Sequence, residues 1–280
     1  MSMHLCLSMW SFALDFQRRN MDIQRFAQTC RDLGVNSVEL VDYFWVSAGQ
    51  PLSVLESSGI RVCAYDIATD FVHLDPTVRH HQVKLACAAI EEAVRVGSGI
   101  VRVLPGKLKP EVSLEDALQM VIEAASSLAR YAHNAGVTVV LEPHEDVVNS
   151  AETLRYVAQQ VGSSAFGVNA DLCTFLLMGL NPVAECAGVV DLCRLVHLND
   201  MRQVSKKYAG YQYRSVTGKT YAGTVVGDGE IDLRGCVKTL VDGGFGGPFS
   251  VECLCMDNAM QGVQKSLENV HKILQEVIQR

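Results

Sequence analysis

The stretch GVTVVLE at residues 136–142 places five apolar or β-branched residues between a glycine and a glutamate. An apolar run without alternation is typical of a strand that is covered on both faces of a parallel sheet. Amphipathic stretches at residues 114–135 and 151–161 precede and follow it. A strand between two helices predicts parallel neighbours, because parallel strands need a crossover connection between them.

The same alternation extends over the whole chain. The expected strands are residues 4–9, 35–41, 60–66, 100–104, 137–142, 165–171, 194–198 and 249–253. The expected helices are residues 21–33, 51–58, 76–96, 114–135, 151–161, 182–189, 232–242 and 259–278. Eight strand–helix units in 280 residues predict an α/β protein with one (β/α)8 TIM-barrel domain over residues 1–280. No GxGxxG motif follows the first strand, which argues against a dinucleotide-binding fold.

The connection after the seventh strand, at residues 201–229, is longer than usual for this fold. It is polar, rich in glycine, and contains four tyrosines. It would lie at the catalytic face of a barrel. We expect an ordered lid or an oligomer contact, with a homo-oligomer or a partner subunit as possibilities, rather than a disordered insertion.

Composition limits the class of protein. The formal net charge is -7, and an acidic surface argues against nucleic acid as a partner, because phosphate binding needs Lys and Arg. The 10 cysteines lie mostly in apolar runs without a CxxC pair, which favours free thiols in a reducing compartment. We find no signal-peptide pattern and no apolar stretch of about 20 residues that could cross a membrane. The sequence therefore predicts a cytoplasmic protein with a small-molecule substrate.

Charged or imidazole side chains end four of the late strands: Glu142, Asp171, His197 and Glu252. A charge at the end of an apolar strand is costly to bury unless something compensates it. In a barrel these strand ends converge on the face that carries active sites. Three carboxylates and one imidazole predict one bound divalent metal ion, with Mn²⁺ or Mg²⁺ favoured and Co²⁺ or Zn²⁺ also suitable.

Strand alternation adds three pocket residues, because side chains two positions apart share a face. His144, Asn169 and Asn199 each lie two positions from one of the four expected ligands. We expect them to line the pocket, His144 only if strand geometry persists through Pro143, whereas Asp200 should point the other way. His144 could instead be an ordinary loop histidine, and Asn169 could orient its neighbouring ligand.

These residue types suit proton transfer next to a carbonyl. A metal chelated by a hydroxy-ketone polarises the carbonyl and stabilises the enediolate that forms on deprotonation. Glu142 and Glu252 could flank the substrate, one removing the proton and the other returning it. His144 is a further candidate acid or base, since its ordinary pKa lies near neutral pH. This is the arrangement that a 1,2-isomerase or an epimerase needs.

Motifs along nearly the whole chain support a resemblance to a known superfamily. They are LGVNSVEL at 33–40, IVRVLPG at 100–106, LEPH at 141–144, GVNADLC at 167–173, LVHLND at 195–200 and VGDGEIDLRGCVKTLVDGGFGGPFSVE at 226–252. With them the chain resembles the sugar phosphate isomerase/epimerase superfamily, the xylose isomerase-like barrels. The resemblance implies a Glu-Asp-His-Glu metal site on the four strand ends named above, with the two glutamates as acid and base in the epimerases.

The resemblance also has departures. Members commonly carry Glu-Asn-His at strand five and His-x-Lys-Asp at strand seven, where this chain has Pro143 and Asn199. These differences indicate a different substrate or reaction. Members often place an apolar wall for the sugar after strand one, where this chain has Trp10. Glu39 at the end of strand two and Arg102 in strand four are further candidates for substrate binding, although either could serve the structure or pair with a neighbouring group.

Two functions fit this set of residues. The first is a divalent-metal-dependent sugar isomerase or epimerase that acts on a ketose, an inosose or a related polyhydroxy carbonyl compound, including sugar acids. The alternative is a lyase of the same superfamily: a dehydratase, a β-keto acid decarboxylase or a C-glycoside deglycosidase. A DNA repair enzyme of the endonuclease IV type would need more metal ligands and a basic groove. A non-catalytic subunit would not need intact ligands at four strand ends.

Overall fold

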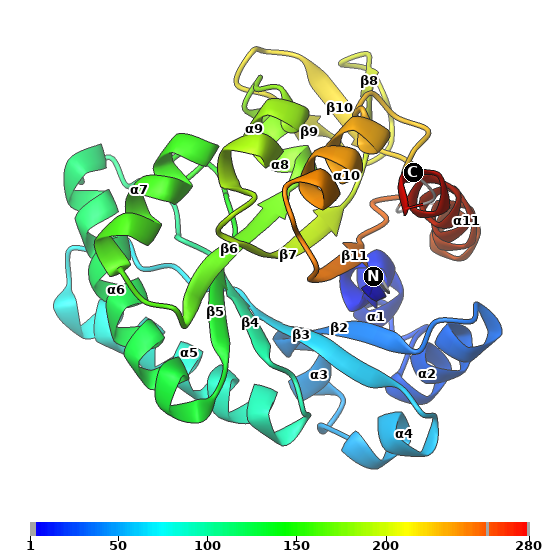
Figure 1. Ribbon diagram of the computed structural model, residues 1–280, viewed down its shortest axis with the longest axis horizontal. Helices are drawn as coiled ribbons and strands as arrows, with labels where there is room; N and C mark the ends of the chain where they lie inside the picture. Colours follow the sequence, from blue (N-terminus) through cyan, green and yellow to red (C-terminus); the bar gives the residue numbers. More distant parts are fainter. Residues whose placement is uncertain (1–3, 256–257, 279–280) are drawn as a thin grey trace.

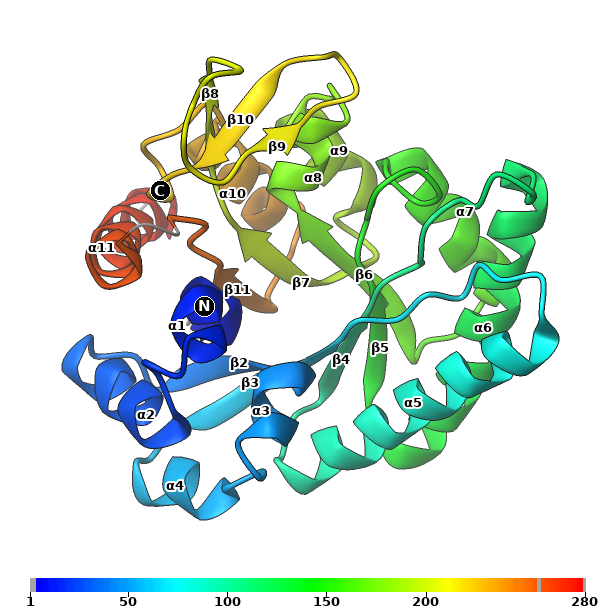
Figure 2. The same ribbon diagram turned by 180° about the vertical axis from the view of Figure 1, so that it is seen from behind.

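Eight parallel strands close into a barrel in the computed structural model, which describes residues 4–255 and 258–278 (Figures 1 and 2). The strands are β1 (His4–Ser8), β2 (Ser37–Val41), β3 (Arg61–Ile67), β4 (Ile100–Val103), β5 (Thr138–Leu141), β6 (Phe166–Asp171), β7 (Cys193–Leu198) and β11 (Pro248–Val251). Their order around the barrel is β1-β11-β7-β6-β5-β4-β3-β2. The predicted TIM barrel is confirmed, with every strand on its expected run.

Helices cover the outside of the barrel (Figure 1). The expected ones are α2 (Ile23–Asp32), α4 (Leu52–Ser57), α5 (Pro76–Arg95), α6 (Leu114–Ala135), α7 (Ala151–Val161), α9 (Pro182–Val189), α10 (Leu233–Asp242) and α11 (Ala259–Ile278). Four short helices were not predicted: η1 (Met9–Phe12), α1 (Ala13–Gln17), α3 (Asp42–Ser47) and α8 (Leu172–Leu177). Three of them continue directly from β1, β2 and β6, so their apolar residues could not be separated from those strands by pattern alone.

The inside of the barrel is filled in layers. Ala64, Val140 and Leu195, from β3, β5 and β7, form a small buried cluster of their own. Side chains from alternate strands fill a TIM-barrel interior in this manner. Since residues two positions apart share a face, the next layer toward the carboxyl ends contains residues 66, 142 and 197. Two of these three were predicted to bind the metal.

The long connection after β7 is ordered. It forms a separate antiparallel sheet of β8 (Met201–Val204), β9 (Tyr213–Arg214) and β10 (Thr220–Gly223), in the order β8-β10-β9. In both views this small sheet lies beside α8 and α10, outside the closed barrel (Figures 1 and 2). The alternative of a disordered insertion is therefore not what the structure shows.

Two predictions about the cellular setting can be compared with the structure. Within the described residues, no helix is long and apolar enough to span a membrane. The ten cysteines are free thiols, as predicted for a reducing compartment. The cytoplasmic location itself stays a prediction.

Candidate metal centre

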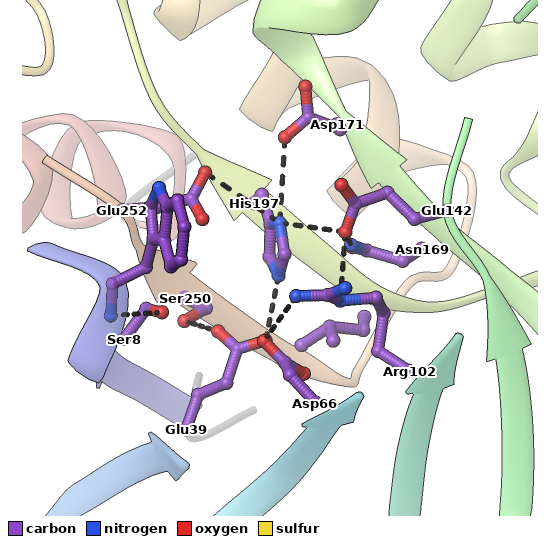
Figure 3. Close-up of polar contacts among 12 residues, drawn as sticks. Ser8, Glu39, Asp66, Arg102, Glu142, Asn169, Asp171, His197, Ser250 and Glu252 are labelled. Carbon is purple, nitrogen blue, oxygen red and sulfur yellow. Dashed lines mark hydrogen bonds and ion pairs between the residues drawn. The ribbon is translucent and has the colours of Figure 1, made fainter. Parts of the chain in front are cut away.

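Three of the four predicted ligands surround an imidazole nitrogen of the fourth, His197 (Figure 3). The Nδ1 atom of His197 lies 3.3 Å from Glu142 Oε2, 3.5 Å from Asp171 Oδ2 and 3.9 Å from Glu252 Oε2. The strand register explains part of this arrangement, because Asp171 and His197 are direct partners across β6 and β7. All four residues are buried, with at most 8% of any of them exposed.

These separations suit ligands of one cation. Two ligands that each lie about 2.1 Å from a metal ion, at angles of about 90–110°, are about 3.0–3.4 Å apart. Glu142, Asp171 and His197 offer ligand atoms that all lie within 4.8 Å of one another, and Glu252 stands outside that tightest group. Three side chains therefore form a compact set, and Glu252 approaches it from β11.

Unpartnered polar atoms support the same conclusion. Among the described residues, four buried side-chain atoms have no hydrogen-bond partner: Asp66 Oδ1, Arg102 Nε, Asn169 Oδ1 and His197 Nδ1. All four belong to the network drawn in Figure 3. Leaving such an atom unpaired costs about 1–3 kcal/mol, so unpaired atoms in a native protein call for a ligand or a functional reason. A cation beside His197 Nδ1 would supply the missing partner of that nitrogen.

Charge balance gives a third argument. The network contains five buried carboxyl groups but only one guanidinium and one imidazole, and the five are Glu39, Asp66, Glu142, Asp171 and Glu252. Buried negative charge in such excess needs a cation or protons to compensate it. The donor set, its spacing and its charge all fit a divalent metal ion held by Glu142, Asp171, His197 and Glu252.

The buried charges of this network shift one another's pKa values. Burial raises the pKa of Glu252 to about 7; the charge of His197 opposes this shift, and those of Asp171 and Glu142 add to it. Burial would also raise the pKa of Glu39, but the charge and hydrogen bond of His197 lower it to about 2. Burial disfavours the imidazolium, yet the surrounding carboxylates raise the pKa of His197 well above its ordinary value.

Glu39 lies on the opposite side of the imidazole from the ligands. Its Oε1 atom is 2.7 Å from His197 Nε2, and its Oε2 atom accepts a hydrogen bond from Ser250. Glu39 is fully buried, and both of its oxygens have protein partners. An Nε2–H group that donates to this carboxylate leaves the Nδ1 lone pair free for a metal. Substrate binding by Glu39 stays a prediction, and the geometry favours the orientation of His197.

Arg102 joins the ligands to β3. Its Nη2 atom donates to Asp66 Oδ2 at 2.9 Å, and its Nε atom lies 3.0 Å from Glu142 Oε2 without the alignment of a hydrogen bond. Asp66 and Arg102 are register partners across β3 and β4. Of the two predicted roles for Arg102, pairing with neighbouring carboxylates is the one that the contacts support.

The two asparagines hold the ligands in place. Asn169 donates to Glu142 Oε2 at 2.9 Å, and Asn199 donates to both Asp171 Oδ2 at 2.6 Å and Glu252 Oε2 at 2.9 Å. Both side chains contact expected ligands, although Asn169 holds Glu142 and not its neighbour Asp171. Contact of either asparagine with substrate stays a prediction.

Asp200 points the other way, as expected from strand alternation. Its two oxygens accept hydrogen bonds from four backbone N–H groups, those of Met201, Gly227, Gly229 and Ile231. This carboxylate closes the base of the long connection and does not join the metal ligands.

His144 and Trp10 lie at the edge of the site. β5 ends at Leu141, and His144 instead pairs with Val148 in a tight loop, so strand geometry does not persist to this residue. Its imidazole is 37% exposed and lies 3.7 Å from Glu145 Oε1. Trp10 is half-buried after β1, with its ring 5.9 Å from that of Phe44. A catalytic His144 and an apolar wall at Trp10 stay predictions.

Two members of the network were not identified from the sequence. Asp66 lies near the end of β3 in the same way as Glu39 near the end of β2, so the strand-end criterion could have found it. Ser250 gave no signal, because a serine within an apolar strand has many ordinary explanations. It pairs in register with His197, which brings its hydroxyl to Glu39.

Comparisons with known proteins agree with the fold. Residues 27–273 match a family model described as the xylose isomerase-like TIM barrel. No curated protein sequence matches the chain.

Many solved structures are similar, at low sequence identity. An IOLI protein with a binding zinc atom has 16% identity and a TM-score of 0.79, with 98% of this chain and 99% of that chain covered. An L-ribulose 3-epimerase has 16% identity and a TM-score of 0.77, with 99% and 96% covered. A barrel protein from Mycobacterium smegmatis in complex with magnesium has 19% identity and a TM-score of 0.71, with 99% and 97% covered. At these identities the structural likeness shows the fold alone.

Proposed function

This chain belongs to the family of xylose isomerase-like TIM barrels, and from that premise we propose that it is a metal-dependent isomerase or epimerase. Its substrate would be a ketose, an inosose or a related polyhydroxy carbonyl compound. The observation that carries the proposal is the convergence of Glu142, Asp171 and Glu252 on the unpartnered Nδ1 atom of His197.

The donor set suggests which metal would serve. Three carboxylate oxygens and one imidazole nitrogen favour Mn²⁺ or Mg²⁺, although Co²⁺ and Zn²⁺ also accept such ligands. Bound here, the ion would polarise a carbonyl oxygen of the substrate and offset the charge that develops on it.

The two glutamates would move the proton. Glu142 follows β5 and Glu252 follows β11, and β6 and β7 separate these strands in the barrel. Carboxylates that approach from separate strands can flank a substrate. One would take the proton from the carbon next to the carbonyl, which leaves an enediolate, and the other would return a proton to the same or the neighbouring carbon. Return to the same carbon gives an epimer, and return to the neighbouring carbon gives an isomer.

The lyase alternative has less support. It rests on Asn199, which stands where family members commonly carry a lysine, and on His144 as an additional acid that could expel a leaving group. The His144 side chain is partly exposed and lies beside Glu145 in a loop. An isomerase or epimerase needs only the two glutamates that do contact the imidazole.

Deuterium exchange tests the proposal directly. The Mn²⁺-loaded protein would be incubated in D2O with a panel of ketoses and inososes, and the products followed by NMR and mass spectrometry. We expect deuterium at a carbon next to the carbonyl without loss of water, CO2 or another fragment. Such a loss would establish the lyase, and no exchange with any compound would contradict the proposed function.

A matched pair of variants ties the exchange to the site. Asp171→Asn should abolish the deuterium exchange, because one predicted metal ligand loses its charge. Asp191→Asn should leave it unchanged, because that carboxylate is exposed and pairs with Arg155 at the surface.

A further inference from the structure

The small sheet after β7 is fixed beside the metal centre at three places. Asp200 closes its base, as described above. At the far end of β10, Gly223 lies so close to Leu254 that a Cβ atom would be 2.2 Å from the Leu254 carbonyl oxygen, so only glycine fits there. Between β9 and β10, the Val216 N–H donates to the Leu177 carbonyl at 3.0 Å. We refer to this anchored sheet of β8, β9 and β10 as the wall.

The attachment points define where this wall lies. Leu254 is two residues beyond Glu252, and Leu177 ends α8, the helix that starts directly after Asp171. The wall therefore connects the ends of the two strands that carry these carboxylates. Figure 2 shows β9 and β10 next to α8.

Tyr213 is an inward-facing residue of this wall. It pairs with Tyr221 across β9 and β10, and paired residues of antiparallel strands share a face. Tyr221 is 3% exposed in the core, and Tyr213 is half-buried against the same core. Tyr211 is 63% exposed and lies outside, with its ring 4.9 Å from that of Tyr213.

The electrostatic surroundings of Tyr213 agree with this orientation. Burial raises the pKa of its phenol, and the charge of Glu252 raises it further, followed by those of Tyr211, Cys173 and Asp171. At neutral pH the phenol is a protonated hydrogen-bond donor.

We propose that Tyr213 is a substrate-binding residue of this site, which donates a hydrogen bond to a substrate hydroxyl on the side of Asp171 and Glu252. The inference rests on the proposed function and deepens it. A phenol O–H can recognise a hydroxyl of a polyhydroxy compound beyond the two carbons that react. It would thereby select substrates that carry a hydroxyl at that position over those that lack one.

The position of Tyr213 can be tested without turnover. The protein would be labelled with 3-fluorotyrosine, and each ¹⁹F resonance assigned with single Tyr→Phe variants. Paramagnetic Mn²⁺ in the metal centre should broaden the Tyr213 resonance strongly. The resonances of Tyr131 and Tyr156 should stay sharp, because these residues lie on the outer helices α6 and α7. A sharp Tyr213 resonance in the Mn²⁺-bound protein would overturn the inference about Tyr213 and leave the proposed function intact. Failure of Mn²⁺ to bind would contradict the proposed function itself.

Kinetics then test the role. Tyr213→Phe should raise KM about 3- to 10-fold, the effect of one neutral hydrogen bond, for the ketose that the wild type exchanges fastest. We expect kcat to change less than about two-fold and Mn²⁺ affinity to stay the same, because the phenol is not a ligand. Tyr211→Phe is the matched control and should change none of these values. An unchanged KM for Tyr213→Phe would refute substrate binding, and an equal loss of kcat and thermal stability would indicate a structural role only.

Discussion

The two halves of the barrel use charged side chains differently. Strands β5, β6, β7 and β11 bring Glu142, Asp171, His197 and Glu252 to one point. In the other half, Glu39 of β2 contacts His197, and Arg102 of β4 contacts both Glu142 and Asp66 of β3. Glu39 is fully buried with both oxygens paired, whereas Glu142 and Glu252 are 7% and 8% exposed and approach an unpaired nitrogen. A glutamate at a strand end can therefore face a candidate cation site or be fully paired with its neighbours, and the surrounding residues decide which.

The largest expected effect lies on the ligand side of this comparison. Glu142→Gln and Glu252→Gln keep the shape of the side chain but remove the group that accepts the proton. Each should lower kcat about 100- to 10,000-fold, with the far-UV spectrum unchanged. Deuterium exchange measures the loss, and Glu268→Gln is the control, because that exposed carboxylate pairs with Lys265 on α11. Full activity in either of the first two variants would remove the acid–base assignment.

Arg102→Met tests the supporting side. It leaves Asp66 and Glu142 buried without their guanidinium, so the free energy of unfolding should fall by about 3–5 kcal/mol. Mn²⁺ affinity should not fall, because a positive charge has been removed from beside the cation site. Urea unfolding and calorimetric titration measure the two quantities. Arg155→Met breaks a surface ion pair and should cost less than about 1 kcal/mol. If Arg102→Met and Arg155→Met lowered the free energy of unfolding equally, burial would add nothing to the Arg102 contacts.

Glu39→Gln should act on the metal rather than on the fold. A neutral amide still fits beside His197 but no longer strengthens the basicity of the imidazole. Metal affinity should therefore weaken about 10- to 100-fold. Titration with Mn²⁺ measures the change, and Glu91→Gln at the surface is the control. If the affinity is unchanged, Glu39 has no influence on the ligand and the two halves act independently.

The last prediction is a pH dependence of the metal-free protein. The folded pKa of Glu252 is raised to about 7, so between its unfolded value of 4.5 and pH 7 the folded state binds more protons than the unfolded state. Stability should then fall as pH rises through this window, on the order of 1 kcal/mol per pH unit. Asp66 is shifted in the same direction, and the raised pKa of His197 extends the fall above pH 6.5.

Thermal unfolding of the chelated protein from pH 5 to pH 7.5 measures this slope. Mn²⁺ should reverse it, because the cation binds the ionised carboxylates and competes with protons. Glu252→Gln should flatten the slope of the chelated protein. Stability that rises with pH in the chelated wild type would contradict the assigned shifts.

The sequence was sufficient for the barrel and for the convergence of the four ligands. Apolar runs located every strand of the barrel, and strand alternation placed Asn169 and Asn199 beside the predicted ligands and Asp200 away from them. The sequence was not sufficient to predict the backbone conformation at His144, because a proline interrupts the alternation and the chain turns back on itself at Val148. The three-stranded sheet was missed because β9 has only two residues, too few for any periodic pattern.

Asp200 has a consequence for how this protein could change over time. Because one carboxylate ties both ends of the long connection to the barrel, changes between these ends that spare the contacts of Val216 and Gly223 should not move His197, three residues before Asp200. If Tyr213 selects the substrate as proposed, this segment sets the specificity of the site while the four predicted ligands stay in place. Grafting other segments between residues 202 and 228 would then change the preferred substrate and leave the predicted metal site intact.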